Sequence, residues 1–286
     1  MTPIIFAIIT AIGWATADIF GGLVARKIGG YSSAILSYII SIILTSFYIP
    51  FAWHELSSIT PTTIIWLLIL TPIGITPLIS LYEGFKVGNP SLVGTIASAF
   101  GGLVAILSVI FLGEKLNVAQ VISILAIILG LVISSLNLRS LNSRQILSDK
   151  GIPFALASLL AWGIYYTFVK IPLQNIGWFW PTYLSYWGFP LVLIFMKIRS
   201  IKLVFPKGRT NQLFMLTNAV LLTIALFSVN YALTIGQSSV VSPISSSYPA
   251  LFAILAYFVF KDRLTKQQIL GIVITLVGVL SLSIAS

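Results

Sequence analysis

Charged side chains, cysteine and histidine are scarce in this chain of 286 residues. Charged residues make up 8% of the sequence, against roughly 25% in soluble domains, so they are too few to cover a water-exposed surface. Cysteine is absent, which excludes disulfides, thiolate metal sites and thiol nucleophiles. The single histidine, His54, lies beside Glu55 in a predicted loop, so neither a catalytic triad nor a multi-histidine metal site is available. We expect no enzyme activity, no cofactor and no bound metal.

Hydrophobic residues are abundant instead, at 58% of the chain, and they indicate that lipid is the solvent for most of it. In such a protein the net charge of +10 does not indicate nucleic-acid binding, because basic loops are held against the anionic cytoplasmic leaflet. A glycine-rich phosphate loop ending in Lys-Ser or Lys-Thr is also absent, which argues against nucleotide-driven pumping. The start Met-Thr-Pro has no basic stretch before its apolar run, so it is typical of a first spanning helix and not of a cleaved signal.

The sequence matches itself at a fixed offset of 148 residues, without a gap. Chance does not easily supply Trp, Tyr, Gln and Gly in the same order twice. The matched pairs are Trp14/Trp162, Ile28-Gly29/Ile176-Gly177, Leu36-Ser37-Tyr38/Leu184-Ser185-Tyr186, Gly88/Gly236, Ser91/Ser239, Ser98/Ser246, Gln120/Gln268 and Gly130/Gly278. We divide the chain into a first repeat at 1–138, a polar linker at 139–150 and a second repeat at 151–286. A duplicated membrane unit is typical of secondary transporters.

Ten segments have the length and apolar character of a spanning helix, which needs about 20 mostly apolar residues. Most breaks between them carry turn residues, such as Gly29-Gly30 and Gly88-Asn89-Pro90. The predicted spans run from about 3 to 24, 32 to 52, 62 to 84, 90 to 112, 117 to 136, 153 to 171, 178 to 197, 211 to 234, 240 to 260 and 266 to 285. The sequence therefore predicts an all-α polytopic membrane protein with ten transmembrane helices.

The odd number of spans in each half has a geometric consequence. With five helices per half, the second half enters the membrane upside down, which predicts two inverted five-helix repeats. The loops after the odd-numbered spans hold 14 of the 16 basic residues, and the other side holds only Lys115 and Lys170. The positive-inside rule then places the basic side in the cytoplasm and both termini outside the plasma (inner) membrane.

Three groups of residues resemble a known family. They are Gly13-Trp14-Ala15-Thr16-Ala17-Asp18-Ile19-Phe20-Gly21-Gly22-Leu23 with Arg26-Lys27; Tyr231-Ala232-Leu233 with Gly236, Ser239, Val241 and Pro243; and Lys261-Asp262-Arg263-Leu264 with Gln268, Gly271 and Gly278. The first half repeats the last two as Tyr82-Glu83-Gly84 with Gly88, Ser91 and Val93, and as Gly113-Glu114-Lys115-Leu116 with Gln120 and Gly130. In this order, and duplicated, they resemble the EamA family of the drug/metabolite transporter superfamily.

The resemblance covers nearly the whole chain and has two departures. Thr95 stands where the second half has Pro243, and Asp262 replaces the glutamate more usual in the family. The resemblance implies ten helices, a central cavity between the halves, and export or uptake of small metabolites. It does not name the substrate.

Asp18 is the most informative polar residue, because it lies well inside the first predicted span. A charge there costs roughly 3 kcal/mol or more, so the side chain should face a cavity or a partner. Trp14 precedes it by four residues and shares its helix face, and the repeat mates of the two are Trp162 and Tyr166. We expect this set to line a cavity for an amphipathic solute. The alternatives are a packing role for Asp18 and interface anchoring for the tryptophans.

Further candidates for substrate binding are the repeat mates Tyr38 and Tyr186, then Tyr82, Glu83, Asn230, Ser246 and Tyr248. Polar groups in a span are tolerated where protein or water-filled space satisfies them. For the tyrosines the alternative is a hydrogen bond between helices. For Glu83 it is an ion pair with Lys86 at i, i+3 spacing. The hairpin ends Glu114-Lys115 and Asp262-Arg263 are assigned to helix termination and left out of the site.

These features favour a secondary transporter that moves a small organic metabolite, an amino acid or a drug-like solute, by alternating access, with export favoured. The expected partners are this small-molecule substrate and the lipid bilayer, with no nucleic acid. Protons are a candidate coupling ion through Asp18 or Glu83, and the protein is expected to be a monomer or a homodimer. The alternatives are a channel-like or a non-transport membrane protein. A channel is disfavoured, because no span carries a ring of like charges or a carbonyl filter.

Overall fold

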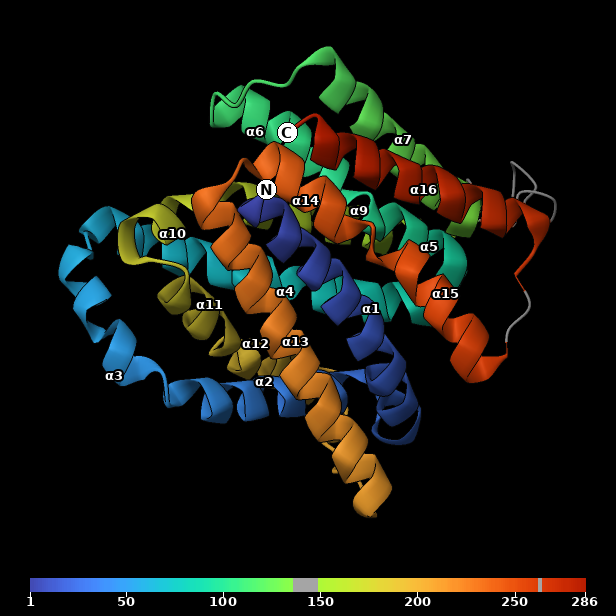
Figure 1. Cartoon of the computed structure of the whole chain (residues 1–286). Helices are drawn as coiled ribbons and strands as arrows, with labels where there is room; N and C mark the ends of the chain where they lie inside the picture. The colour runs from blue at the N-terminus through green and yellow to red at the C-terminus, as the bar shows by residue number, and fades with distance from the viewer. Residues whose placement is uncertain (136–148, 262–263) are drawn as a thin grey trace.

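The computed structural model describes residues 1–135, 149–261 and 264–286, and these residues form helices and no strand (Figure 1). Most of the predicted linker at 139–150, and the pair Asp262-Arg263, lie outside the described residues. The all-helical fold class predicted from the sequence is confirmed.

Eight helices, or broken helices, are long and apolar enough to cross a membrane. Five are continuous: α1 (Thr2–Ile28), α4 (Pro61–Val87), α7 (Val118–Ser135), α13 (Arg209–Ile235) and α16 (Lys266–Ile284). Three consist of two segments each: α5 (Pro90–Ser98) with α6 (Phe100–Phe111), α9 (Ile152–Phe168) with α10 (Lys170–Ile176), and α14 (Ser238–Ser246) with α15 (Tyr248–Phe260).

The two remaining predicted spans, at 32–52 and 178–197, are broken by proline. The first consists of α2 (Gly30–Ser46), which is followed after a 67° bend by α3 (Ile49–Ala52) and η1 (Trp53–Ser58). The second consists of the short helices α11 (Phe179–Tyr186) and α12 (Phe189–Ile198). A proline ring clashes with the carbonyl four residues earlier, and Pro50 and Pro190 follow the ends of α2 and α11 at that distance. The described residues therefore hold eight spans, or nine with the bent pair, and the count of ten is not confirmed.

The repeat is visible in the helix boundaries. α4 at 61–87 corresponds to α13 at 209–235, and α5 at 90–98 to α14 at 238–246, both at the offset found in the sequence. Gly29 after α1 and Gly177 after α10 are also matched, and both have positive φ angles, 82° and 71°. A side chain is strained in this backbone conformation, which explains why glycine stands at both positions.

The second repeat begins at the opposite end of the molecule from the first. Pro3, at the start of α1, packs against Gly236, and the repeat mate of this contact is Gly151, at the start of α9, against Gly88. Gly30, which follows α1, packs against Tyr82 at the end of α4. The chain therefore has a termini side, marked by Pro3 and Gly236, and a linker side, marked by Gly88 and Gly151.

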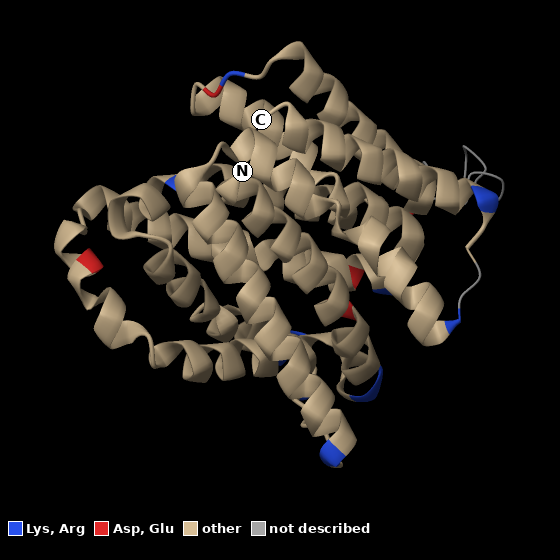
Figure 2. Cartoon of the chain, viewed as in Figure 1, with Lys and Arg blue, Asp and Glu red and all other residues tan. Residues whose placement is uncertain are grey.

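Close helix packing joins the two repeats. α1 packs along α13, and α7 packs along α16, where Gly130 and Gly278 allow the backbones to approach (Figure 1). The side chains of Asn117 and Gln120 cap each other's backbone N–H groups at the start of α7, and Thr265 and Gln268 do the same for α16. Figure 2 shows Lys and Arg mostly away from the two termini, and the helix bodies are nearly free of charge.

Candidate functional site

A cavity of about 730 Å³ lies between the two repeats. The first repeat contributes residues of α1, α2, α4, α5, α6 and α7 to its wall, and the second contributes residues of α9, α11, α13, α15 and α16. Residues near the linker side also line it, including Pro90, Ser91, Leu264 and Gln268, whereas Gly236, Ser238 and Glu114 on the termini side do not. The cavity therefore extends from the middle of the molecule toward the linker side.

One face of α1 shapes this cavity. Trp14 and Asp18 lie four residues apart on it, and Gly21, Gly22 and Ala25 continue the same face toward the linker side. At Gly22 a Cβ atom would find no other atom within 4 Å, so the face is open there. Because the residues that follow Asp18 on this face are small, they leave space in the cavity between the carboxylate and the linker side.

The matching face of α9 and α10 is filled. Trp162 and Tyr166 stand at the positions of Trp14 and Asp18, and Val169 and Leu173 stand where α1 has Gly21 and Ala25. Val169 and Leu173 are buried in the main hydrophobic core. Equivalent positions in the two repeats thus leave space on the linker side and fill it on the termini side.

Five aromatic residues close the inner end of the cavity, and we call them the aromatic cluster: Trp14, Phe100, Trp162, Tyr166 and Tyr248. Trp14 lies 5.7 Å from Tyr248 and 6.0 Å from Tyr166, measured between ring centroids. Phe100 lies 6.4 Å from Trp14 and 5.4 Å from Trp162, so the two matched tryptophans flank one phenylalanine. Such tilted and edge-on contacts are favourable arrangements for aromatic rings.

Asp18 is the only charged residue that lines the cavity in the part of the chain that the structure describes. Its side chain is accessible within the cavity, and it has no hydrogen-bond or ion-pair partner among the described residues. Tyr82 on α4 and Tyr248 on α15 line the same cavity as this carboxylate. An unpaired acid in a membrane-spanning helix is a functional candidate by default.

The termini side is closed by α6 packed against α14. Gly101 on α6 lies so close to α14 that a Cβ atom there would overlap the Ser246 hydroxyl. Ser245 of α14 in turn donates a hydrogen bond to the Ala7 carbonyl of α1, at 3.4 Å. The cavity therefore has no lining residue beyond this contact.

Glu114, in the loop after α6, forms a second contact on this side. Lys170 donates a hydrogen bond to it at 2.8 Å, and Ser238 and Ser239 donate backbone N–H groups, each at 2.8 Å. The Ser239 hydroxyl donates a further bond at 2.6 Å. Burial alone would raise the pKa of the Glu114 carboxyl, but the hydrogen bonds from Lys170 and the two serines outweigh it and hold this pKa below its usual value.

The linker side lacks the equivalent packing. The repeat mates of α14 and α6 are α5 and α15, and these two helices make at most isolated contacts. At Gly94 of α5 a Cβ atom would meet only the Phe85 ring, at 3.9 Å. Among the described residues, the two ends of this pseudo-symmetric molecule therefore differ: helices pack across the cavity on the termini side and not on the linker side.

A model of the EamA-like transporter family matches residues 1–136 and, a second time, residues 149–284. The chain belongs to the EamA-like transporter family. The resemblance found in its motifs is confirmed, and the chain is a multi-pass membrane protein with the architecture of two EamA repeats.

Two further comparisons agree with this membership. An uncharacterized protein of Methanocaldococcus jannaschii is 31% identical over 139 residues, which are 48% of this EamA-family chain and 99% of that protein, about the length of one repeat. A protein of known crystal structure is similar over 99% of this chain and 98% of its own, with a TM-score of 0.83 and 15% sequence identity. At this identity the likeness shows the fold alone.

Eight of the eleven residues proposed from the sequence line the cavity of this EamA-family protein. They are Trp14, Asp18, Tyr38, Tyr82, Trp162, Tyr166, Tyr186 and Tyr248. The matched Tyr38 and Tyr186 contact each other, with ring centroids 5.6 Å apart.

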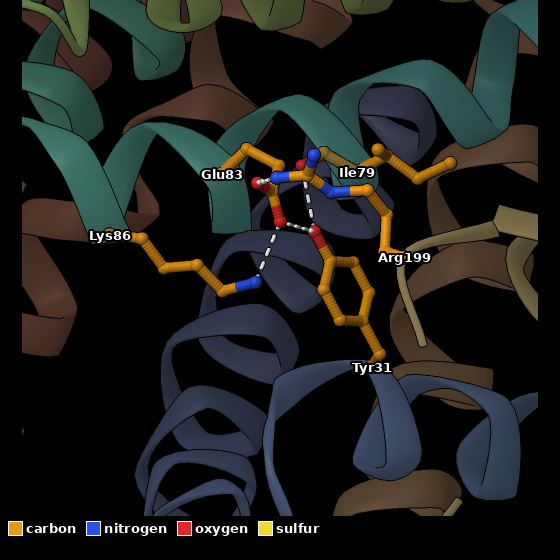
Figure 3. Close-up of polar contacts among 5 residues, drawn as sticks. All are labelled: Tyr31, Ile79, Glu83, Lys86 and Arg199. Atoms are coloured by element: carbon orange, nitrogen blue, oxygen red, sulfur yellow. Dashed lines mark hydrogen bonds and ion pairs between the residues drawn. The ribbon is translucent and has the colours of Figure 1, made fainter. Parts of the chain in front are cut away.

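The other three proposed residues lie outside the lining. Glu83 accepts hydrogen bonds from Tyr31 at 2.7 Å, Lys86 at 2.6 Å and Arg199 at 3.3 Å (Figure 3). Asn230 is buried and donates to the Thr182 hydroxyl at 2.7 Å. Ser246 is buried in the contact between α6 and α14.

Several aromatic lining residues were not proposed from the sequence, among them Phe85, Phe100, Tyr165 and Phe252. A signal existed for Phe100, because its repeat mate is Tyr248, and an aromatic residue at both positions is itself a matched feature. Tyr165 has Ala17 as its mate, so the repeat gave no indication of it.

Proposed function

We propose that this protein is a secondary transporter that carries a small organic solute through the central cavity by alternating access. The observation that carries the proposal is the difference between the two ends: the cavity reaches the linker side and stops at the contact of α6 with α14. Its volume, about 730 Å³, is within the range of cavities that hold drug-sized ligands. In the opposite state of the cycle, α5 and α15 would pack together and close the linker side. The related pair α6 and α14 would separate and open the termini side.

The proposed direction is export across the plasma membrane. Of the 16 basic residues, only Lys115 and Lys170 belong to loops or helix ends on the termini side, so the positive-inside rule supports a cytoplasmic linker side. A cytoplasmic solute would then reach Asp18 without a conformational change. Both termini would be external, and the state described would be the inward-open one.

Proton coupling is part of the proposal, with Asp18 as the group that takes up and releases the proton. It is the only carboxylate of the described residues that lines the cavity, whereas Glu83 is held by three donors outside it. Asp18→Asn keeps the size and most of the hydrogen-bonding capacity of the side chain but removes the charge. We expect this variant to insert and fold normally, and to lose transport or its dependence on a pH gradient.

The experiment begins with a thermal-shift screen of the purified protein against amino acids, nucleosides, sugars and cationic drugs, since a ligand of the native state raises the melting temperature. Hits are then tested for counterflow in proteoliposomes, with wild-type protein and Asp18→Asn. Uptake of labelled solute that is accelerated by unlabelled solute inside supports alternating access. Uptake that does not saturate and is not accelerated would identify a channel instead, and wild-type transport by Asp18→Asn would remove the assigned role of this residue.

A further inference from the structure

The charges around the cavity are of one sign. Asp18 contributes a carboxylate, and among residues 1–135, 149–261 and 264–286 no Lys, Arg or His lines the cavity. Two other acids in the described parts of the chain do have ion-pair partners, and both lie outside the cavity lining. Glu83 pairs with Lys86 and Arg199, and Glu114 pairs with Lys170. From the described part of the chain, a solute in the cavity therefore meets one unpaired negative charge and no compensating cation.

Backbone donors do not supply an anion site either. The start of α5 reaches the cavity at Pro90 and Ser91, but the N–H groups of Ser91 and Leu92 are directed to the Asn89 side chain, at 3.0 and 3.3 Å. At the start of α16, the N–H group of Gln268 is directed to the Thr265 hydroxyl, at 3.2 Å. Helix N-termini bind anions through free N–H groups, and here these groups already have partners.

The walls near Asp18 are aromatic. Trp14 lies one turn from it on α1 and 5.7 Å from Tyr248 between ring centroids, and Tyr82 lines the same cavity. Aromatic faces attract cations that are partly removed from water, and tryptophan does so most strongly. The remaining members of the aromatic cluster offer apolar surface to the rest of a solute.

We infer that the solute of this cavity is an organic monocation, an ammonium group on an aromatic or aliphatic body, with the ammonium at Asp18 and the body against the aromatic cluster. The inference rests on the proposed function and names its substrate class. Anionic solutes would meet Asp18 as a like charge. A zwitterionic amino acid would bring a carboxylate for which the described lining residues offer no positive partner.

A series of four ligands with one phenyl body tests the inference: phenethylamine, 2-phenylethanol, 3-phenylpropionate and phenylalanine, which are cationic, neutral, anionic and zwitterionic at neutral pH. Binding to the purified full-length protein is measured by isothermal titration calorimetry up to millimolar concentrations. We expect phenethylamine to bind most tightly. Asp18→Asn should weaken its binding about 10- to 100-fold and leave 2-phenylethanol nearly unchanged, because a hydrogen bond to a charged group is lost.

Two variants control the measurement. Glu55→Gln removes the same charge in η1, at a residue that does not line the cavity, and should leave the order of the four ligands unchanged. Trp14→Leu keeps an apolar side chain but removes the aromatic face, and should weaken phenethylamine about threefold or more relative to 2-phenylethanol. The ratio of amine to alcohol affinity is independent of small losses in stability, so a partly destabilised variant remains informative.

Equal or tighter binding of the alcohol, the carboxylate or phenylalanine would overturn the inference, as would no binding of phenethylamine. An unchanged amine-to-alcohol ratio in Asp18→Asn would do the same. Failure of the proposed function gives a different result: the charge preference is present, but phenethylamine shows no counterflow in proteoliposomes. Conversely, counterflow of a neutral or anionic solute without binding of the amine would support transport and refute the substrate class.

Discussion

Removal of the Glu114 carboxylate should destabilise the protein strongly and open its termini side. Glu114 joins the first repeat to Lys170 of α10 and to the start of α14, both in the second repeat. The side chains of Glu114 and Lys170 are 7% and 13% exposed, so the ion pair is largely removed from solvent. Loss of one partner leaves the other charge buried without compensation.

The expected magnitude follows from this burial. Glu114→Ala removes four hydrogen bonds and leaves Lys170 with only the Gly236 carbonyl, which accepts from it at 2.7 Å. Breaking a buried pair in this way costs about 3–5 kcal/mol. Glu114→Gln retains an acceptor for only one of the two backbone N–H groups, because Ser238 binds Oε1 and Ser239 binds Oε2, and it should cost about 2 kcal/mol or more, the contribution of a charged hydrogen bond.

The lowered pKa of Glu114 adds a pH dependence with a defined sign. Because the pKa is lower in the folded than in the unfolded state, the carboxylate stabilises the fold fully above the unfolded-state pKa. This contribution is lost as the pH falls through the folded-state pKa. In Glu114→Gln the corresponding loss of stability in acid should be absent.

Unfolding by sodium dodecyl sulfate in mixed micelles, followed by tryptophan fluorescence, measures these differences. Lys115→Gln is the matched control, because Lys115 is the exposed neighbour and should change stability by less than about 0.5 kcal/mol. A double-mutant cycle with Lys170→Met isolates the pair. A change below about 0.5 kcal/mol for Glu114→Ala, or an unchanged acid dependence for Glu114→Gln, would refute the reasoning.

Three further outcomes are expected. Gly22→Leu should fold like wild type, because no atom lies within 4 Å of the Cβ position at Gly22. The larger side chain should block solute access and abolish transport in the proteoliposome assay, whereas Gly22→Ala should transport normally. Glu83→Gln should lower the free energy of unfolding by about 1–2 kcal/mol in the same micelle assay, because its cationic partners Lys86 and Arg199 are largely exposed. It should preserve transport, because Glu83 does not line the cavity; loss of transport in stable protein would contradict this. A reporter fused after Ser286 that is active only in the cytoplasm should stay silent in cells, and a strong signal would reverse the proposed orientation.

The repeat was the most productive sequence feature, because residues matched at its offset have structural roles that both halves need. Gly29 and Gly177 adopt positive φ angles, and Gly130 and Gly278 lie where α7 and α16 approach. Gln120 caps α7, and its mate Gln268 caps α16. These are local requirements of backbone geometry and packing, which recur wherever the same fold recurs. They predict the architecture and carry no information on the substrate.

The count of ten spans is not confirmed at the two places where local breaks outweigh average hydropathy. A window of apolar residues does not register that Pro50 and Pro190 interrupt a helix, so the second and seventh spans were predicted as continuous. The partners of the charged side chains could not be predicted from the sequence for a different reason. Glu114 meets Lys170 over a separation of 56 residues, and nothing in either local segment indicates the other.

The unequal filling of α1 and α9–α10 has a thermodynamic consequence. Two identical inverted repeats could exchange roles, and their inward-open and outward-open states would be degenerate by symmetry. Here Val169 and Leu173 of the second repeat stand at the positions of Gly21 and Ala25 in the first. The side-chain volume that fills the termini side therefore has no equivalent on the linker side. The degeneracy is broken, and each difference of about 1.4 kcal/mol populates one end state tenfold over the other. Under the proposed cycle, a solute is selected by how far its binding offsets this built-in bias, as well as by how tightly it binds.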